Sequence, residues 1–209
     1  MDKKKLVLFI TIGILFIFLF IIGFLVYSHQ TVKPGVKNLA KEKIGVIYCS
    51  YNNDGVKDIV DIISKKIKSE VIELKPAVAY PTNKEEFVKR VDTENADISK
   101  VVLDNKIIDL RKYKLVIFAT PVLRNKTCPV LQKFIDDNAP RIVNKPVASV
   151  VRYEQTDKDI RETLDYLYYR LHDGKQKPNF VTYARDKKQL EYEIGLWFDE
   201  MEFERGDLR

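Results

Sequence analysis

The sequence predicts a three-layer α/β domain, with helices on both faces of a doubly wound parallel five-stranded sheet, preceded by one N-terminal transmembrane helix. Five short apolar runs alternate with amphipathic helical stretches, and the strongest runs are apolar at consecutive positions, as in strands buried on both faces. An uncharged run near the N-terminus predicts the membrane helix. Right-handed crossovers make 2-1-3-4-5 the expected strand order.

The apolar run covers residues 6–27 and carries no charge. As a helix it spans about 33 Å, enough to cross a bilayer core of about 30 Å. The alternative is a cleaved signal peptide, but this run is longer than a signal peptide's apolar region and does not end in small residues. We therefore expect membrane lipid to retain the chain through this segment.

Basic residues flank the membrane segment on both sides. The N-terminus, residues 1–5, contains three lysines, which favours a cytoplasmic N-terminus and an extracytoplasmic soluble domain. Residues 28–42 contain three more lysines and form a basic tether that can lie on anionic lipid. We expect a single-pass protein of the cell membrane, with the extracytoplasmic side slightly favoured for the soluble domain, residues 43–209.

The first half of the soluble domain is expected to alternate strand and helix. Residues 43–49 (KIGVIYC) form an apolar run, and residues 55–68 place isoleucine and valine at helical spacing. Residues 70–74 form a second β-like run, which Pro76 ends. Residues 84–101 form a polar helix with one apolar face. These elements predict the first two strands, each followed by a helix.

The second half continues the alternation. Its first strand, KLVIFA, is the most apolar of the five. The helix that follows the fourth strand has apolar residues at 3–4 spacing and is closed by Gly174. The expected strands are 114–119, 146–151 and 179–183, and the expected helices are 129–137, 157–172 and 186–203.

Composition and charge argue against several classes of function. The chain has 209 residues, of which 45% are hydrophobic and 32% are charged, as in globular domains. The net charge of +6 comes from 36 basic and 30 acidic residues scattered along the chain, which does not indicate a nucleic-acid partner. Two cysteines and two histidines do not suffice for a multi-cysteine or histidine-rich cluster, so no metal is expected.

Three loops are expected to form the site, because ligands of parallel sheets bind beyond the carboxyl ends of the strands, where the strand order reverses. These loops are residues 50–55, 120–128 and 152–156. We find no nucleophile elbow, no phosphate-binding loop of the G-x-x-x-x-G-K type and no paired-carboxylate signature. The sequence therefore identifies no catalytic residue.

Motifs along residues 43–205 carry a family resemblance. They are the first strand with its loop, Glu73-Leu74-Lys75-Pro76 with Tyr80-Pro81, Leu110 and Tyr113 with Val116-Ile117, Ala119-Thr120-Pro121-Val122, and Pro129 through Ile135. In their order and spacing the chain resembles the flavodoxin family, in particular the short-chain flavodoxin-like proteins of bacteria. The resemblance implies an FMN-binding domain that transfers electrons, here with a redox partner in the membrane.

The resemblance also implies which residues would bind FMN. A phosphate site needs hydroxyls and free backbone N–H groups at a helix N-terminus. Ser50, Tyr51, Asn52, Asn53 and Gly55 would hold the phosphate, and Pro121, Leu123, Arg124, Asn125 and Tyr153 would border the flavin ring.

All three loops depart from the family pattern, which leaves a second function open. Asp54 in the first loop would repel a dianionic phosphate by about 1 kcal/mol or more, and Asp is also a typical helix N-cap. The second loop lacks the family's stacking aromatic residues, and the third loop lacks its glycines. The alternative is a flavin-free interaction or scaffolding module at the membrane.

The two cysteines follow neighbouring strands of the predicted sheet. Cys49 ends the first strand and Cys128 follows the third, so a disulfide is conceivable if the domain is extracytoplasmic. Two unpaired, partly buried thiols are the preferred expectation, because neighbouring strands do not guarantee the geometry that a disulfide requires.

Overall fold

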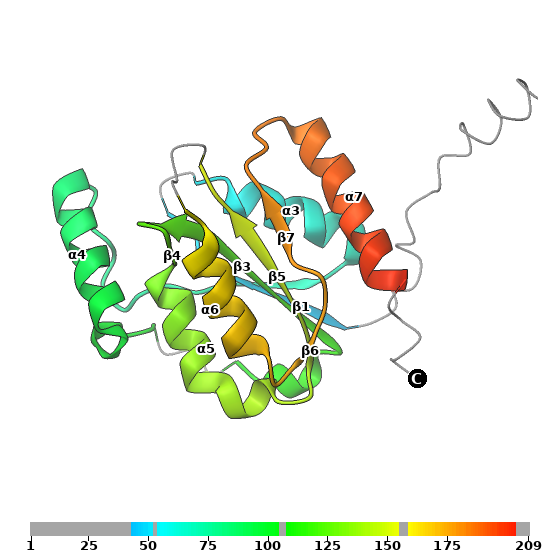
Figure 1. Cartoon of the computed structure of the whole chain (residues 1–209), viewed down its shortest axis with the longest axis horizontal. Coiled ribbons are helices and arrows are strands. Elements are labelled where there is room, and N and C mark those ends of the chain that lie inside the picture. The colour runs from blue at the N-terminus through cyan, green and yellow to red at the C-terminus, as the bar shows by residue number, and fades with distance from the viewer. Residues whose placement is uncertain (1–42, 52–53, 105–107, 155–158, 204–209) are drawn as a thin grey trace, which may run out of the picture. The chain divides into compact units, whose positions relative to one another are not determined.

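The computed structural model describes residues 43–51, 54–104, 108–154 and 159–203 (Figure 1). These residues belong to the second of two compact units, Val36–Arg209. The predicted basic N-terminus 1–5, membrane segment 6–27 and tether 28–42 lie outside the described residues. Within the described ranges, no helix combines the length and apolar character that a membrane crossing requires.

The described elements alternate strand and helix along the chain. In order they are β1 (Ile44–Tyr48), α3 (Val56–Ile67), β2 (Glu70–Glu73), α4 (Lys84–Ala96), the 3₁₀ turns Ile98–Lys100 and Leu110–Lys112, β3 (Leu115–Leu123), β4 (Lys126–Thr127), α5 (Pro129–Ile142), β5 (Pro146–Arg152), α6 (Arg161–Leu171), β6 (Lys175–Gln176), β7 (Phe180–Thr182) and α7 (Lys187–Phe203).

The sheet has the order β2-β1-β3-β5, and β6 and β7 both pair with the far side of β5. All of these pairs are parallel, so the predicted order 2-1-3-4-5 is confirmed. The predicted fifth strand, residues 179–183, is β7, whereas β6 was not predicted and is separated from β7 by residues 177–179. Pro178 lies in this gap, and a proline cannot donate a ladder hydrogen bond.

The pairing of β4 was not predicted either. β4 folds back antiparallel on β3 through a two-residue turn. Both turn residues, Arg124 and Asn125, have positive φ angles of 56° and 65°, as the tight turns that match strand twist require. The second predicted loop is therefore largely a hairpin.

The sheet separates two apolar cores, which confirms the three predicted layers. On one face α3 and α7 pack over side chains such as Val46, Ile117 and Val150. On the other face α5 and α6 pack over the alternate residues of the same strands, such as Ile47 and Val116. Figure 1 shows the two helix pairs on opposite sides of the sheet.

Two helix ends differ from expectation. α4 ends at Ala96 rather than near residue 101, because the extended backbone of Asp97 starts a 3₁₀ turn and its side chain accepts a hydrogen bond from the Ser99 N–H. α5 continues to Ile142, beyond the predicted end at 137, and includes Pro140. Neither change moves the loops at the carboxyl edge of the sheet.

Candidate functional site

The three predicted loops meet at the carboxyl edge of the sheet. Pro121 on β3 is the register partner of Arg152 on β5. Gly55, before α3, lies so close to Arg152 that a Cβ added to the glycine would be 3.1 Å from the arginine Nε. Cys49, after β1, donates its N–H to the Ala119 carbonyl at 3.2 Å. Residues from loops far apart in sequence thus share one small region.

The first loop forms a cradle of hydrogen-bond donors, and the carboxylate of Asp54 occupies it. Oδ1 accepts hydrogen bonds from the Ser50 hydroxyl at 2.9 Å and from the Val56 N–H at 3.0 Å. Oδ2 accepts one from the Tyr51 N–H at 2.7 Å. Gly55, with φ of 81°, is the formal N-cap of α3 and supplies no side chain, so Asp54 satisfies the first helical N–H in its place. The cradle can therefore hold an anion, and here the anion belongs to the chain itself.

Opposing effects act on the Asp54 carboxyl. Burial raises its pKa above the ordinary value of 3.8, which outweighs the opposing effects of the Tyr51 and Val56 N–H groups, the Ser50 hydroxyl and the positive charge of Arg152. The carboxyl thus takes up a proton more readily than an exposed aspartate does.

Arg152 is a buried cation beside the cradle, with 5% of its surface exposed. Its guanidinium donates to the carbonyl oxygens of Tyr153 and Thr182 and lies 3.6 Å from the Glu154 carboxylate. Sequence reasoning missed this residue, although an arginine that directly ends the apolar run PVASVV was a visible signal. Arg152 therefore places a positive charge next to the first loop.

The second loop is only partly directed toward the cradle. Pro121 is buried in β3, and Leu123 is half-buried against the core. Arg124 instead forms an ion pair with Asp92 on α4, with Nε 3.0 Å from Oδ1. The Asn125 carbonyl accepts a hydrogen bond of 3.4 Å from the Thr163 hydroxyl on α6. The predicted pair Arg124 and Asn125 therefore contacts helices, not the first loop.

The third loop is described only at its start. Tyr153 is half-buried and packs edge-on against Tyr183, with ring centroids 5.5 Å apart. Residues 155–158 lie outside the described ranges, as do the predicted phosphate ligands Asn52 and Asn53.

Tyr51 turns its side chain inward, onto an aromatic cluster. Its ring lies 4.7 Å from that of Tyr80, nearly perpendicular at 83°, and 5.7 Å from that of Phe87 on α4. Its hydroxyl lies 3.2 Å from the Cys128 sulfur. One residue of the first loop therefore joins the cradle, through its N–H, to the start of α5.

Cys49 and Cys128 are joined by a disulfide, so the preferred expectation of two free thiols is wrong. Their Cα atoms are 7.0 Å apart, and the two residues are 1% and 0% exposed. The two cysteines meet because β1 and β3 are neighbouring strands. Cys49 follows β1, and Cys128, the N-cap of α5, follows the β3–β4 hairpin at the same edge of the sheet. The disulfide ties the first loop to the second.

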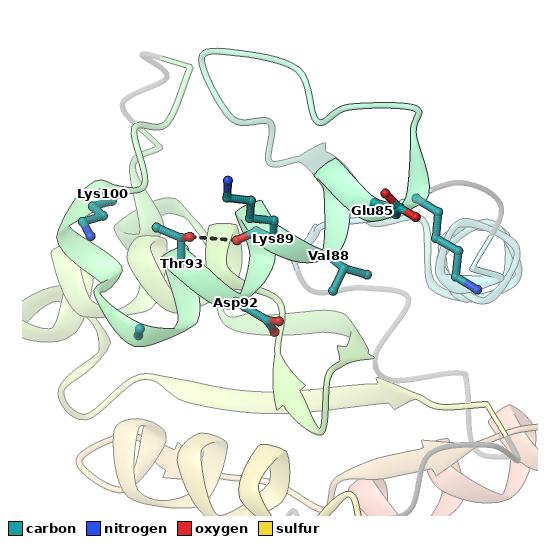
Figure 2. A pocket seen from close by; sticks show the side chains of 8 residues that line it. Glu85, Val88, Lys89, Asp92, Thr93 and Lys100 are labelled. Carbon is teal, nitrogen blue, oxygen red and sulfur yellow. Dashed lines mark hydrogen bonds between the residues drawn. The ribbon is translucent and has the colours of Figure 1, made fainter.

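A groove of about 960 Å³ runs along α4, separate from the three loops (Figure 2). Its lining residues are Lys84, Glu85, Val88, Lys89, Asp92, Thr93, Ala96 and Lys100. Their charges are mixed, and the Thr93 hydroxyl is bonded to the helix's own Lys89 carbonyl. We assign the candidate site to the three loops, because donors converge on one point there and not in this groove.

No family profile matches the sequence, and no curated protein is recognisably similar to it. Solved structures do match. A flavoprotein from Lactobacillus acidophilus, solved in complex with FMN, is 17% identical with a TM-score of 0.58 and aligns over 75% of this chain and 98% of its own. A protein from Bacteroides uniformis, provisionally described as a flavoprotein, is 16% identical with a TM-score of 0.61. The alignment covers 73% of this chain and 97% of that protein.

A second provisionally named flavoprotein, from Bacteroides eggerthii, is 17% identical with a TM-score of 0.59, over 74% of this chain and 97% of its own. At such identities the likeness is one of fold. The chain has the flavodoxin-like fold, and the resemblance seen in the motifs is confirmed at that level.

Proposed function

We propose that this protein binds FMN at the three loops and transfers electrons at a membrane surface. The single observation that carries the proposal is the donor cradle of the first loop, located at the strand-order reversal of a flavodoxin-like sheet. The likeness to a flavoprotein solved in complex with FMN supports it. A fold alone does not fix a function, so the residues of the three loops decide it.

The donor set of the cradle fits a phosphate. The Ser50 hydroxyl and the N–H groups of Tyr51 and Val56 already hold a carboxylate, at the N-terminus of α3, where the helix dipole favours an anion. Arg152 adds a positive charge next to this point. A phosphate would take the same donors, provided that the Asp54 side chain rotates out of the cradle.

Bound FMN would supply the electron-transfer chemistry, and the chain's residues would bind and orient it. Ser50, Tyr51 and Gly55 would hold the phosphate end. Leu123 and Tyr153 would border the ring and exclude water from it. No side chain of these loops has to move a proton for this function.

A second candidate function is a flavin-free interaction module. The observation that favours it is again Asp54, whose carboxylate satisfies three donors at 2.7 to 3.0 Å. A loop that satisfies its own donors folds stably without a ligand. The two candidates differ in one measurable respect, the affinity for FMN once Asp54 is removed.

The deciding experiment compares the full chain, purified in detergent, with its Asp54→Ser variant. FMN is titrated and its fluorescence followed. We expect Asp54→Ser to bind FMN about tenfold more tightly than the wild type, because removing a carboxylate beside a dianion relieves about 1 kcal/mol or more of repulsion.

Asp58→Asn is the matched control. Asp58 is an exposed carboxylate in the first turn of the same helix and takes no part in the cradle. Its loss should change FMN affinity less than about twofold. If neither the wild type nor Asp54→Ser binds FMN, the electron-transfer proposal is wrong and the flavin-free module is the better account.

Membrane attachment is part of the same proposal. Residues 6–27 would insert into lipid, and the basic tether 28–42 would keep the domain near the surface. Attachment raises the effective concentration of the domain near redox partners in the same membrane.

A further inference from the structure

Basic residues that are scattered in the sequence gather at the amino edge of the sheet, where the parallel strands begin. The segments that border this edge are Lys43, 65–70, 109–114, 141–145 and 172–175. They contain ten basic and three acidic residues, and the last turns of α7 add Asp199 and Glu200. Residues 43–209 as a whole have 30 basic and 28 acidic residues, so this edge carries more positive excess than the entire domain.

Backbone hydrogen bonds show that these segments are neighbours. The Lys114 N–H donates to the Lys43 carbonyl at 2.8 Å, and the Lys175 N–H donates to the Lys145 carbonyl at 2.9 Å. The Lys145 ammonium donates to the Tyr113 carbonyl at 2.7 Å. Burial lowers the pKa of Lys145, and the positive charge of Lys114 lowers it further. The cations are therefore close enough to repel one another.

Most of this charge is not neutralised by the protein. Arg111 pairs with Asp109 at 2.8 Å, and Lys112 pairs with Glu70 at 2.6 Å. Five other lysines are exposed, and no described carboxylate lies within ion-pair distance of their ammonium groups. These lysines, which we call the basic edge, are Lys43, Lys65, Lys68, Lys114 and Lys175.

The chain from the predicted membrane segment enters the domain at this same edge. The tether, residues 28–42, directly precedes Lys43, and β1 begins at Ile44. Fully extended, a tether of this length reaches at most about 50 Å. The amino edge is thus the end of the sheet that the covalent connection holds nearest to the anchor.

We propose that the basic edge binds anionic lipid headgroups of the membrane that holds the anchor. Exposed lysines are attracted to a negatively charged lipid surface when they come within a Debye length of it. Val143, at the C-cap of α5, is 48% exposed among these lysines and supplies an apolar contact for the headgroup region. The inference rests on the proposed membrane attachment and does not depend on FMN.

This contact would also orient the domain. The three loops lie at the carboxyl edge, opposite the basic edge. With the amino edge on lipid, the donor cradle faces away from the bilayer. A redox partner would then meet the cradle through a part of its structure outside the lipid.

The test reconstitutes the full chain in vesicles of phosphatidylcholine, or of phosphatidylcholine and phosphatidylglycerol in equal parts. Lysines are labelled briefly with a membrane-impermeant amine-reactive ester, and mass spectrometry measures the rate at each lysine. We expect the basic edge to react at least about threefold more slowly in the vesicles that contain phosphatidylglycerol. Salt at about 0.5 M should remove the difference.

Lys57, Lys187 and Lys188 are internal controls in the same chain. They are exposed at the N-terminal ends of α3 and α7, where these helices leave the carboxyl edge. Their labelling rates should stay within about 1.5-fold between the two kinds of vesicle, because the proposed contact lies at the opposite edge.

Two variants with the same change in charge test the surface directly. The edge variant combines Lys65→Gln, Lys68→Gln and Lys114→Gln, and the matched control combines Lys57→Gln, Lys187→Gln and Lys188→Gln. Both variants keep Lys43 and Lys175, whose protection from labelling is the readout. We expect the edge variant to lose this protection and the control variant to keep it. Circular dichroism confirms that both variants are folded.

Two results would overturn the proposal. One is a wild-type chain whose basic edge reacts at the same rate in both kinds of vesicle. The other is a control variant that loses as much protection as the edge variant, which would assign the attraction to net charge and not to this surface.

The anchor is tested separately by flotation with the phosphatidylcholine vesicles, because neutral lipid does not attract lysines. A chain that these vesicles do not retain would contradict the membrane anchor. The same labelling after addition of preformed phosphatidylglycerol vesicles would still decide whether the basic edge binds lipid.

Discussion

A single carboxylate, that of Asp54, determines what the first loop can bind. It takes the Ser50 hydroxyl and two backbone N–H groups, the donors that an external anion would need. The sequence predicted the conflict, because a carboxylate in an anion-binding loop is unfavourable whatever the exact geometry. It did not predict the buried Arg152, because the burial of a charged side chain depends on tertiary neighbours that no local pattern encodes.

The same residue gives a pH-dependent prediction. The pKa of Asp54 is raised above 3.8 by burial, so in the folded protein the carboxyl is protonated at higher pH than in the unfolded chain. Protonation removes the negative charge that competes with an external anion. Sulfate, which stays dianionic throughout, should bind more tightly as the pH falls from about 7 to about 4.

Calorimetric titration with sulfate measures the effect. In Asp54→Ser the competing charge is absent at every pH, so the sulfate affinity should change little over this range. A wild-type affinity that stays constant, or falls, on acidification would show that Asp54 does not compete for the cradle.

At the scale of elements, the sequence predicted helices and strands most reliably where buried residues repeat with a fixed period. The consecutive apolar residues of β3 predicted a buried strand, and the isoleucine spacing of α3 predicted a helix. Each pattern buries its apolar side chains in one type of secondary structure and not in the other. The β3–β4 hairpin was missed because Arg124 and Asn125 do not have the glycine that usually marks such a turn. The break between β6 and β7 depends on pairing, which the sequence alone does not show.

The end of α3 carries a correctable strain. Lys68, which is exposed, has a left-handed backbone with φ of 49° and donates its N–H to the Ser64 carbonyl. Glycine adopts this conformation without a steric penalty and is the preferred residue at such helix ends. Lys68→Gly should raise the free energy of unfolding by about 1 kcal/mol in urea denaturation.

Lys65→Gly serves as the control, because Lys65 is exposed within the same helix, where glycine should lower stability by about 1 kcal/mol. If both variants lose stability, the backbone at Lys68 does not cost what its angles imply.

At the scale of the whole molecule, the disulfide bears on the cellular compartment. Stable disulfides persist mainly in oxidising surroundings outside the cytoplasm. Together with the lysines of residues 1–5, the Cys49–Cys128 bond favours an extracytoplasmic domain. We therefore propose that the soluble domain faces outward from the membrane.

Protease treatment of spheroplasts from a bacterial host tests this orientation. The domain of the wild-type chain should be digested without lysis, whereas a variant with Lys3, Lys4 and Lys5 changed to Gln should be partly protected, because the lysines after the membrane segment then dominate. Full protection of the wild-type domain would place it in the cytoplasm and contradict the proposal.

The interruption between β6 and β7 affects how this edge of the sheet can contact other molecules. An unbroken outer strand would offer a row of free backbone groups on which a second molecule could add its own strand. Here that margin consists of two fragments of two and three residues, with Pro178 between them. A margin cut into such short lengths discourages copies of this protein from pairing edge to edge.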